Sequence, residues 1–249
     1  MKASARDIDH LSITTASPDE LANRLQQLGF TTTPEGVEPR CICFQPDSDE
    51  IPNYIELLEG EPSVALAVNV DELEGETRTH SWESEDGYEV EAEMIVGEGG
   101  APPPWFPVKH NTPDALMEPE WIVHPNGALA LLAIHVVAED PPATAKSLGE
   151  AWKVITEDIF DGCVLVSTGA VELLIWSKAA WQQEYKAIEA MAPEELPAVV
   201  GFAIAIERVR PLQALLGANN VSFGLGEDGR VIVAPEQAGG LMIEFMPQN

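Results

Sequence analysis

The chain has 249 residues, 45% of them hydrophobic, and its 13 basic against 42 acidic residues give a formal net charge of −29. A chain this long and apolar can bury a real core, as one large domain or two of ordinary size. Its acidic surface would repel phosphate backbones and anionic lipids, which argues against partners among nucleic acids and membranes. The charge excess also indicates self-repulsion that salt relieves, and so a salty habitat.

The N-terminus and the cysteines point to a cytoplasmic protein. The first ten residues, MKASARDIDH, contain no apolar h-region, and no stretch approaches the about 18 apolar residues that a membrane span needs. Cys41, Cys43 and Cys163 are too few, and odd in number, for a disulfide framework. We expect the thiols to pack as small hydrophobic residues in a reducing compartment.

The first 60 residues have the pattern of one βαβββ unit. Residues 7–15 alternate between apolar and polar and predict a strand, on which Ile8, His10 and Ser12 would share a face. Ser17 and Pro18 predict a helix start, with Ser17 as the N-cap, and Gly29 predicts its end. Three more strands are expected at 30–33, 41–45 and 54–58.

The unit recurs along the chain. The third copy is predicted as a strand at 131–137, a helix from Asp140 to Trp152, strands at 154–156, 164–167 and 171–176, and a bridging helix at 179–192. The fourth is predicted as a strand at 199–206, a helix at 209–216, and strands at 221–224, 230–234 and 241–246. The second is degraded, with strands at 63–70, 88–96 and 105–111 and a short helix at 71–73. The repeat predicts an α+β protein of four βαβββ modules, paired as residues 1–128 and 129–249.

Histidines and glutamates recur at matching places in these units. His10 and His135 lie in the opening strands of the first and third units. The closing strands read NYIELL, AVELLI and LMIEFM and contain Glu56, Glu172 and Glu244, while the second closing strand has His110 near that position. A carboxylate within an apolar strand needs a partner or a cation. Each residue also has an ordinary alternative, such as a hydrogen-bonded core histidine or a glutamate that faces solvent or pairs with arginine.

If the first and last strands of a unit lie in one curved sheet, His10, Glu56 and His110 converge. Two imidazoles and one carboxylate, with open positions for water and substrate, suit a divalent transition metal in an enzyme. Trp105, Phe106 and Trp121 flank this site and could wall an apolar substrate pocket. By contrast, His124 in the turn His-Pro-Asn-Gly is expected to be structural, and His80 to lie in a polar loop without a specific role.

The strings DHLSI, YIEL, AIHVV and IEF, with helices between them, resemble the vicinal oxygen chelate (glyoxalase/bleomycin-resistance/dioxygenase) superfamily. Residues 109–113, with Trp121 and residues 124–128, are similar to a motif of its glyoxalase-like-domain proteins, and the resemblance is clearest over 7–140. It implies a glyoxalase-like fold, in which paired βαβββ modules form cup-shaped sheets around a divalent metal ion (Zn, Fe, Mn, Ni or Mg). The implied ligands are His10, Glu56 and His110. A second, weaker set would be His135, Glu172 and Glu244.

The resemblance implies a metal-dependent lyase, isomerase or dioxygenase acting on a small substrate with vicinal oxygens. Glu56 could serve as the general base if it is not tightly ligated. The alternative is a metal-free protein of the same fold that sequesters a small molecule, since an acidic surface would attract a cationic drug. A catalytically inactive scaffold is a third reading, and a homodimer is left open.

Overall fold

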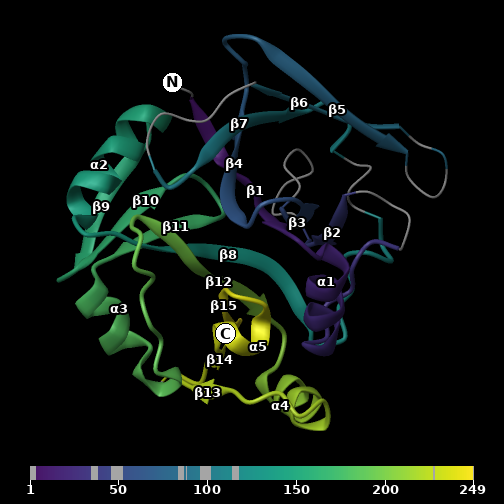
Figure 1. Ribbon diagram of the computed structural model, residues 1–249, viewed down its shortest axis with the longest axis vertical. Coiled ribbons are helices and arrows are strands. Elements are labelled where there is room, and N and C mark those ends of the chain that lie inside the picture. The colour runs from purple at the N-terminus through teal and green to yellow at the C-terminus, as the bar shows by residue number, and fades with distance from the viewer. Residues whose placement is uncertain are drawn as a thin grey trace.

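The computed structural model describes residues 4–34, 39–45, 53–83, 87, 89–95, 102–113, 118–226 and 228–248. These residues form two mixed sheets. Figure 1 shows the paired strands β5 (Thr77–Glu83) and β6 (Glu89–Ile95) at one end of the molecule and helix α4 (Val209–Ala218) at the other. None of the helices in these ranges is long and apolar enough to cross a membrane.

The first sheet contains seven strands, in the order β2-β3-β1-β4-β7-β6-β5. Its elements are β1 (Ala5–Thr15), α1 (Pro18–Gln27), β2 (Arg40–Cys43), β3 (Tyr54–Glu59), β4 (Ser63–Val70), β5 (Thr77–Glu83), β6 (Glu89–Ile95) and β7 (Trp105–His110).

The second sheet contains eight strands, in the order β13-β14-β15-β12-β8-β11-β10-β9. Its strands are β8 (Ala128–Val137), β9 (Ile155–Phe160), β10 (Cys163–Ser167), β11 (Glu172–Trp176), β12 (Ala198–Ile206), β13 (Gly224–Leu225), β14 (Val231–Val233) and β15 (Met242–Pro247). Its helices are α2 (Pro141–Trp152), α3 (Lys178–Glu184), a 3-10 turn (Lys186–Ile188), α4 (Val209–Ala218) and α5 (Pro235–Ala238).

Both sheets are built on the same pairing scheme. The opening strands of two units lie side by side and antiparallel, β1 with β4 and β8 with β12. Each opening strand also pairs in parallel with the closing strand of its own unit, β1 with β3, β4 with β7, β8 with β11 and β12 with β15. The predicted α+β architecture of paired βαβββ-type modules is therefore confirmed.

Some predicted elements differ in the structure. Residues 30–33 form no strand, because side chains take over part of their backbone pairing: Thr31 N donates to His124 Nδ1 (3.0 Å), and Thr33 Oγ1 accepts from Cys41 N (2.9 Å). The helix expected at 71–73 is absent, since these residues form a bend and coil. The segment around His80, predicted as a loop, is strand β5, because it pairs along its whole length with β6.

Helix starts follow the predicted chemistry only in part. Asp140 caps α2, its carboxylate accepting from Ala143 N at 3.0 Å, and α2 begins with Pro141 as expected. Ser17 precedes α1, but its side chain makes no capping hydrogen bond. The first turn of α1 still contains Asp19 and Glu20, which suit the positive end of a helix.

One hydrophobic core runs between the two sheets. The Trp105 ring of β7 meets Trp152 of α2 edge to face, with centroids 5.6 Å apart, and Phe30 stacks on Phe245 at 5.7 Å. Asp7 of β1 also crosses between the halves, since its carboxylate accepts from the backbone amides of Ala170 (3.1 Å) and Val171 (3.0 Å). Each sheet thus has one face in the shared core and leaves its other face for a site.

A one-residue bulge in β1 decides which side chains reach that other face. Ile8 pairs with Val68 and His10 with Ala67, so Asp9 is an extra residue opposite β4. A bulge turns side chains that simple alternation would send to the opposite side. Ile8 accordingly lies in the core with Leu11 and Ile13. The expectation that Ile8 shares a face with His10 and Ser12 is therefore wrong.

Candidate metal centre

Asp9, His10 and His110 form a buried cluster on the face of the first sheet that points away from the shared core. Oδ1 of Asp9 lies 2.8 Å from His10 Nδ1 and 2.9 Å from His110 Nε2. Asn69 Nδ2 donates to the other carboxylate oxygen of Asp9 at 2.8 Å. One potential ligand atom from each of Asp9, His10 and His110 lies within 4.8 Å of the others. We call this face, with Ser12 and Glu56, the first cup.

Glu56 of β3 lies on the other side of His10. Its Oε2 accepts a hydrogen bond from Ser12 Oγ (3.0 Å) and lies 3.6 Å from His10 Nε2. The parallel register pairs Ser12 with Glu56 and His10 with Tyr54, which sets the carboxylate beside the imidazole. The three residues predicted to converge, His10, Glu56 and His110, thus come from β1, β3 and β7 of one sheet, with β4 between β1 and β7.

The walls of the first cup are mostly apolar. His10 stacks on Tyr54 with ring centroids 4.3 Å apart, and Phe106 meets His10 edge-on at 5.8 Å. Trp121 packs with Tyr54 and with Cys41 and Cys43, which are buried as the sequence predicted. Phe106 therefore contacts the cluster directly, and Trp121 lies behind Tyr54.

Trp105 does not belong to this wall, and its prediction as a pocket residue is wrong. It lies on β7 next to Phe106, and consecutive strand residues point to opposite faces. Its ring is 1% exposed and packs in the shared core against Trp152.

The cluster holds opposite charges in a buried space. Burial alone would raise the pKa of Asp9, but the charge of His110 and hydrogen bonds from His10 and His110 outweigh burial and hold it well below the usual value. Burial would lower the pKa of His110, but the charge of Asp9 and its hydrogen bond outweigh this and raise it. Burial raises the pKa of the Tyr54 hydroxyl well above its ordinary value, with Asp9 and Glu56 adding to the shift.

This donor set fits a divalent metal ion. His10 Nε2 and His110 Nδ1 are buried ring nitrogens with no hydrogen-bond partner among the residues that the structure describes, and an imidazole nitrogen in that state is available as a ligand. A metal-bound histidine commonly gives its second ring nitrogen to a carboxylate, which is the relation of His10 Nδ1 to Asp9. Sequence reasoning missed Asp9. The available signal was the spacing of Ile8 and Leu11, which breaks strict alternation.

The second sheet has a corresponding face, which we call the second cup, with His135, Glu172, Trp176 and Glu244. His135 pairs with Leu174, whereas His10 pairs with Tyr54. If the two opening histidines are equivalent, Trp176 occupies the position of Glu56, and Glu172 lies four residues before it. The assumed equivalence of Glu56 and Glu172 is therefore wrong, because loop lengths hid the register. Glu244 lies near His135, with Oε2 3.3 Å from Nε2.

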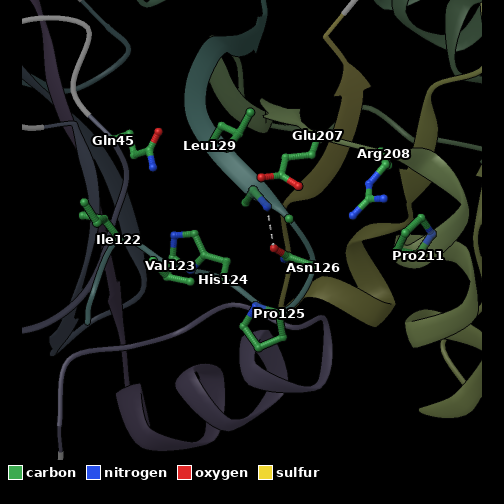
Figure 2. A pocket seen from close by; sticks show the side chains of 12 residues that line it. Gln45, Ile122, Val123, His124, Pro125, Asn126, Leu129, Glu207, Arg208 and Pro211 are labelled. Atoms are coloured by element: carbon green, nitrogen blue, oxygen red, sulfur yellow. Dashed lines mark hydrogen bonds between the residues drawn. The ribbon is translucent and has the colours of Figure 1, made fainter. Parts of the chain in front are cut away.

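His124 is structural, as the turn predicted. Nδ1 accepts from Thr31 N at 3.0 Å, and Nε2 lies 2.9 Å from Cys43 O, to which it donates. Burial lowers the pKa of His124 to about 4, although its hydrogen bond to Cys43 raises it. His124 lines a depression of about 310 Å³. Figure 2 shows Glu207 and Arg208 on the side of this depression opposite His124.

Comparison with known proteins rests on structure alone, since no family model and no curated protein matches this sequence. The chain is similar to a variant of homoprotocatechuate 2,3-dioxygenase from Brevibacterium fuscum, with 14% identity over 100% of this chain and 73% of that one and a TM-score of 0.61. It is similar to a hypothetical protein from Staphylococcus aureus, with 8% identity over 97% and 99% of the two chains and a TM-score of 0.62.

A third similar structure is a xylose isomerase-like TIM barrel/4-hydroxyphenylpyruvate dioxygenase fusion protein, with 14% identity over 99% of this chain and a TM-score of 0.55. This chain spans about half of that protein, since 50% of it is covered. Together with the two sheets of paired modules, these likenesses show that the chain has the fold of the vicinal oxygen chelate superfamily.

Proposed function

We propose that this protein binds one divalent metal ion in the first cup and acts as an enzyme on a small substrate with vicinal oxygens. The observation that carries the proposal is the convergence of two buried imidazoles on carboxylates, with His10 Nε2 and His110 Nδ1 left without partners. Leaving such nitrogens buried and unpaired costs free energy unless something binds them. A metal ion would remove that cost.

Two carboxylates compete for the third ligand position, and we assign it to Glu56. The Asp9 carboxylate already accepts hydrogen bonds from His10, His110 and Asn69, so we assign it the role of orienting the two imidazoles. Among the described residues, Ser12 is the one that donates a hydrogen bond to the Glu56 side chain, whose Oε2 faces Nε2 of His10. Asp9 is the alternative ligand, and separate variants distinguish the two.

A divalent ion bound here would supply Lewis acidity toward oxygens of a substrate. Residues of the chain would transfer the proton and hold the substrate. Glu56, where it is not tightly ligated, could take a proton from the substrate, with Ser12 holding its Oε2 in position. Phe106 and Trp121 would hold the apolar part of the substrate and exclude water. The choice among lyase, isomerase and dioxygenase chemistry is open.

A metal-free sequestering protein is the second candidate. One observation favours it: Asp9 Oδ1 is close to both imidazoles, so a protonated histidine could complete the cluster without a cation. In that case the first cup would bind its small molecule through the aromatic wall alone.

Metal titration tests the proposal. Protein treated with a chelator is reloaded separately with Zn²⁺, Mn²⁺, Fe²⁺, Ni²⁺ and Mg²⁺, and metal content and affinity are measured by elemental analysis and calorimetry. We expect one ion per chain, lost in a His10→Ala/His110→Ala variant and retained in His135→Ala, the matched control in the second cup. Glu56→Gln should weaken binding more than Asp9→Asn if Glu56 is the ligand. A folded protein that takes up none of these metals would refute the enzyme and leave the sequestering protein.

A further inference from the structure

The second cup encloses a cavity of about 440 Å³ that the proposed function does not use. Strands β8, β11 and β15 form its floor, and Tyr185, whose ring packs on Trp181 with centroids 4.2 Å apart, lines one side. Its wall is mainly apolar and includes Ile159, Phe160 and Leu174. A cavity of this size with a few convergent polar groups has the form of a small-molecule site.

Arg230 of the loop before β14 supplies the positive charge in this cavity. Its guanidinium donates to Glu244 Oε1 at 2.5 Å and to Glu184, lies over the Tyr185 ring at 5.6 Å, and has Nε 3.2 Å from Asp228. The Glu244 carboxylate also accepts from Tyr185 Oη at 3.2 Å. A guanidinium therefore neutralises the carboxylate that a metal ion would need.

One ring nitrogen of His135, Nδ1, already has a hydrogen-bond partner. Trp176 Nε1, which can only donate, gives its hydrogen bond to His135 Nδ1 at 3.2 Å, so the ring proton sits on Nε2. Nε2 lies 3.3 Å from Glu244 Oε2 without hydrogen-bond geometry and remains a buried donor that lines the cavity. A metal ligand needs a lone pair at that atom, so His135 offers none to a metal ion through Nε2.

The charge that is left over in the cavity is negative. Glu172, Glu184 and Glu244 line it together with Arg230, and the Arg230 guanidinium already pairs with Glu184, Glu244 and Asp228. Glu172 is exposed at the mouth, and its side chain makes no hydrogen bond or ion pair within the described part of the chain. An anion would have to displace a carboxylate from Arg230, but a cation finds Glu172 free and the aromatic faces of Phe160 and Trp176 nearby.

We propose that the second cup is a metal-free binding site for an organic cation with an apolar body, its charge at Glu172 and its body against Phe160, Trp176 and Leu174. The formal net charge of −29 would raise the local concentration of such a cation around the protein. This proposal does not depend on a metal in the first cup.

The test compares three probes of similar shape on chelator-treated protein: the phenethylammonium cation, neutral 2-phenylethanol and the phenylacetate anion. Affinity is measured by calorimetry and by the fluorescence of the tryptophans. We expect the cation to bind at least about tenfold more tightly than the anion, with the affinity for 2-phenylethanol between the two. Added NaCl should lower the affinity for the cation. Equal or tighter binding of the anion, or no binding of any probe, would overturn the proposal.

Variants locate the site. Glu172→Gln should lower the affinity for phenethylammonium about threefold, as expected for one partly exposed charge. Glu150→Gln, the same change on the exposed face of α2, should leave it unaltered. Ala170→Trp at the exposed mouth should block the cavity with little risk to folding, which circular dichroism checks. Undiminished binding in folded Ala170→Trp, or equal losses in Glu172→Gln and Glu150→Gln, would show that the probe binds elsewhere and refute the assignment.

Discussion

The carboxylate of Asp9 lies 2.8 Å from the ring nitrogen Nδ1 of His10, although the two residues are neighbours on one strand. Neighbouring side chains in a regular strand point to opposite faces, so this contact exists only because β1 bulges at Asp9. The bulge brings a carboxylate behind the imidazole and leaves Nε2 directed at Glu56. It makes Asp9 the residue that orients the proposed metal ligands.

The first prediction concerns Asp9→Asn. The amide keeps the shape of the side chain but loses the charge that holds His10 and His110, so metal affinity should fall about 10–100-fold, as for other orienting partners of metal-bound histidines. Calorimetric titration with Zn²⁺ measures this, with the exposed Asp19→Asn as the control for the lost charge. Unchanged affinity in a folded Asp9→Asn protein would remove Asp9 from the site.

The second prediction is acid sensitivity through His124. Its folded-state pKa of about 4 lies below the ordinary value of 6.5, so the unfolded chain binds the proton first. The stability that His124 contributes is therefore present above pH 6.5 and lost as the pH falls toward 4, a loss on the order of 2–3 kcal/mol. Urea unfolding at several pH values measures it, and His124→Gln should remove this part of the pH dependence. If the variant keeps the wild-type profile, His124 does not titrate in this way.

Asp7 gives a third prediction with the opposite sign. Burial raises its pKa from 3.8 to about 6, against the hydrogen bonds from Val171, Ala170 and Ile8. Its contribution to stability is thus fully present below pH 3.8 and is lost as the pH rises through 6. Asp7→Asn should flatten the slope of stability against pH. It should also lower the free energy of unfolding by about 1–3 kcal/mol, because the amide NH₂ would face a backbone N–H that the carboxylate had accepted from.

Because Asp7 and His124 oppose each other between about pH 4 and 6, the wild-type profile in this range hides both contributions, and each variant should uncover the slope of the other residue. Identical urea profiles for Asp7→Asn and His124→Gln would contradict both assignments.

The fourth prediction separates the two faces of β7. Trp105→Ala opens a cavity in the shared core beside Trp152 and should destabilise the protein by about 3–5 kcal/mol, with metal affinity unchanged in the folded protein. Phe106→Ala removes a half-buried wall of the first cup and should cost less stability but weaken binding of a substrate or inhibitor. Thermal unfolding measures the stability of Trp105→Ala and Phe106→Ala, and metal titration measures their metal affinity. A larger loss of stability in Phe106→Ala than in Trp105→Ala, or a loss of metal affinity in Trp105→Ala, would show that Trp105 faces the first cup.

The sequence predicted the repeat, the pairing of modules and the meeting of His10, Glu56 and His110, because these follow from strand periodicity and from an architecture that recurs. Three features were beyond it. The bulge at Asp9 depends on how β1 pairs with β4. The match of Trp176 to Glu56 depends on the register of β11 against β8. The ion pair of Arg230 with Glu244 depends on contact between a loop and a strand residue fourteen positions later. Each is a property of tertiary pairing, so local pattern carries little signal for it.

The central claim is one metal ion held between His10 and His110. The most direct measurement is an anomalous difference map from a crystal of chelator-treated protein soaked in Zn²⁺ or Mn²⁺. The account predicts a single strong peak about 2.0–2.2 Å from a ring nitrogen of each of these histidines, with Glu56 as the nearest carboxylate. An empty first cup, or a peak at His135 and Glu244 instead, would contradict it.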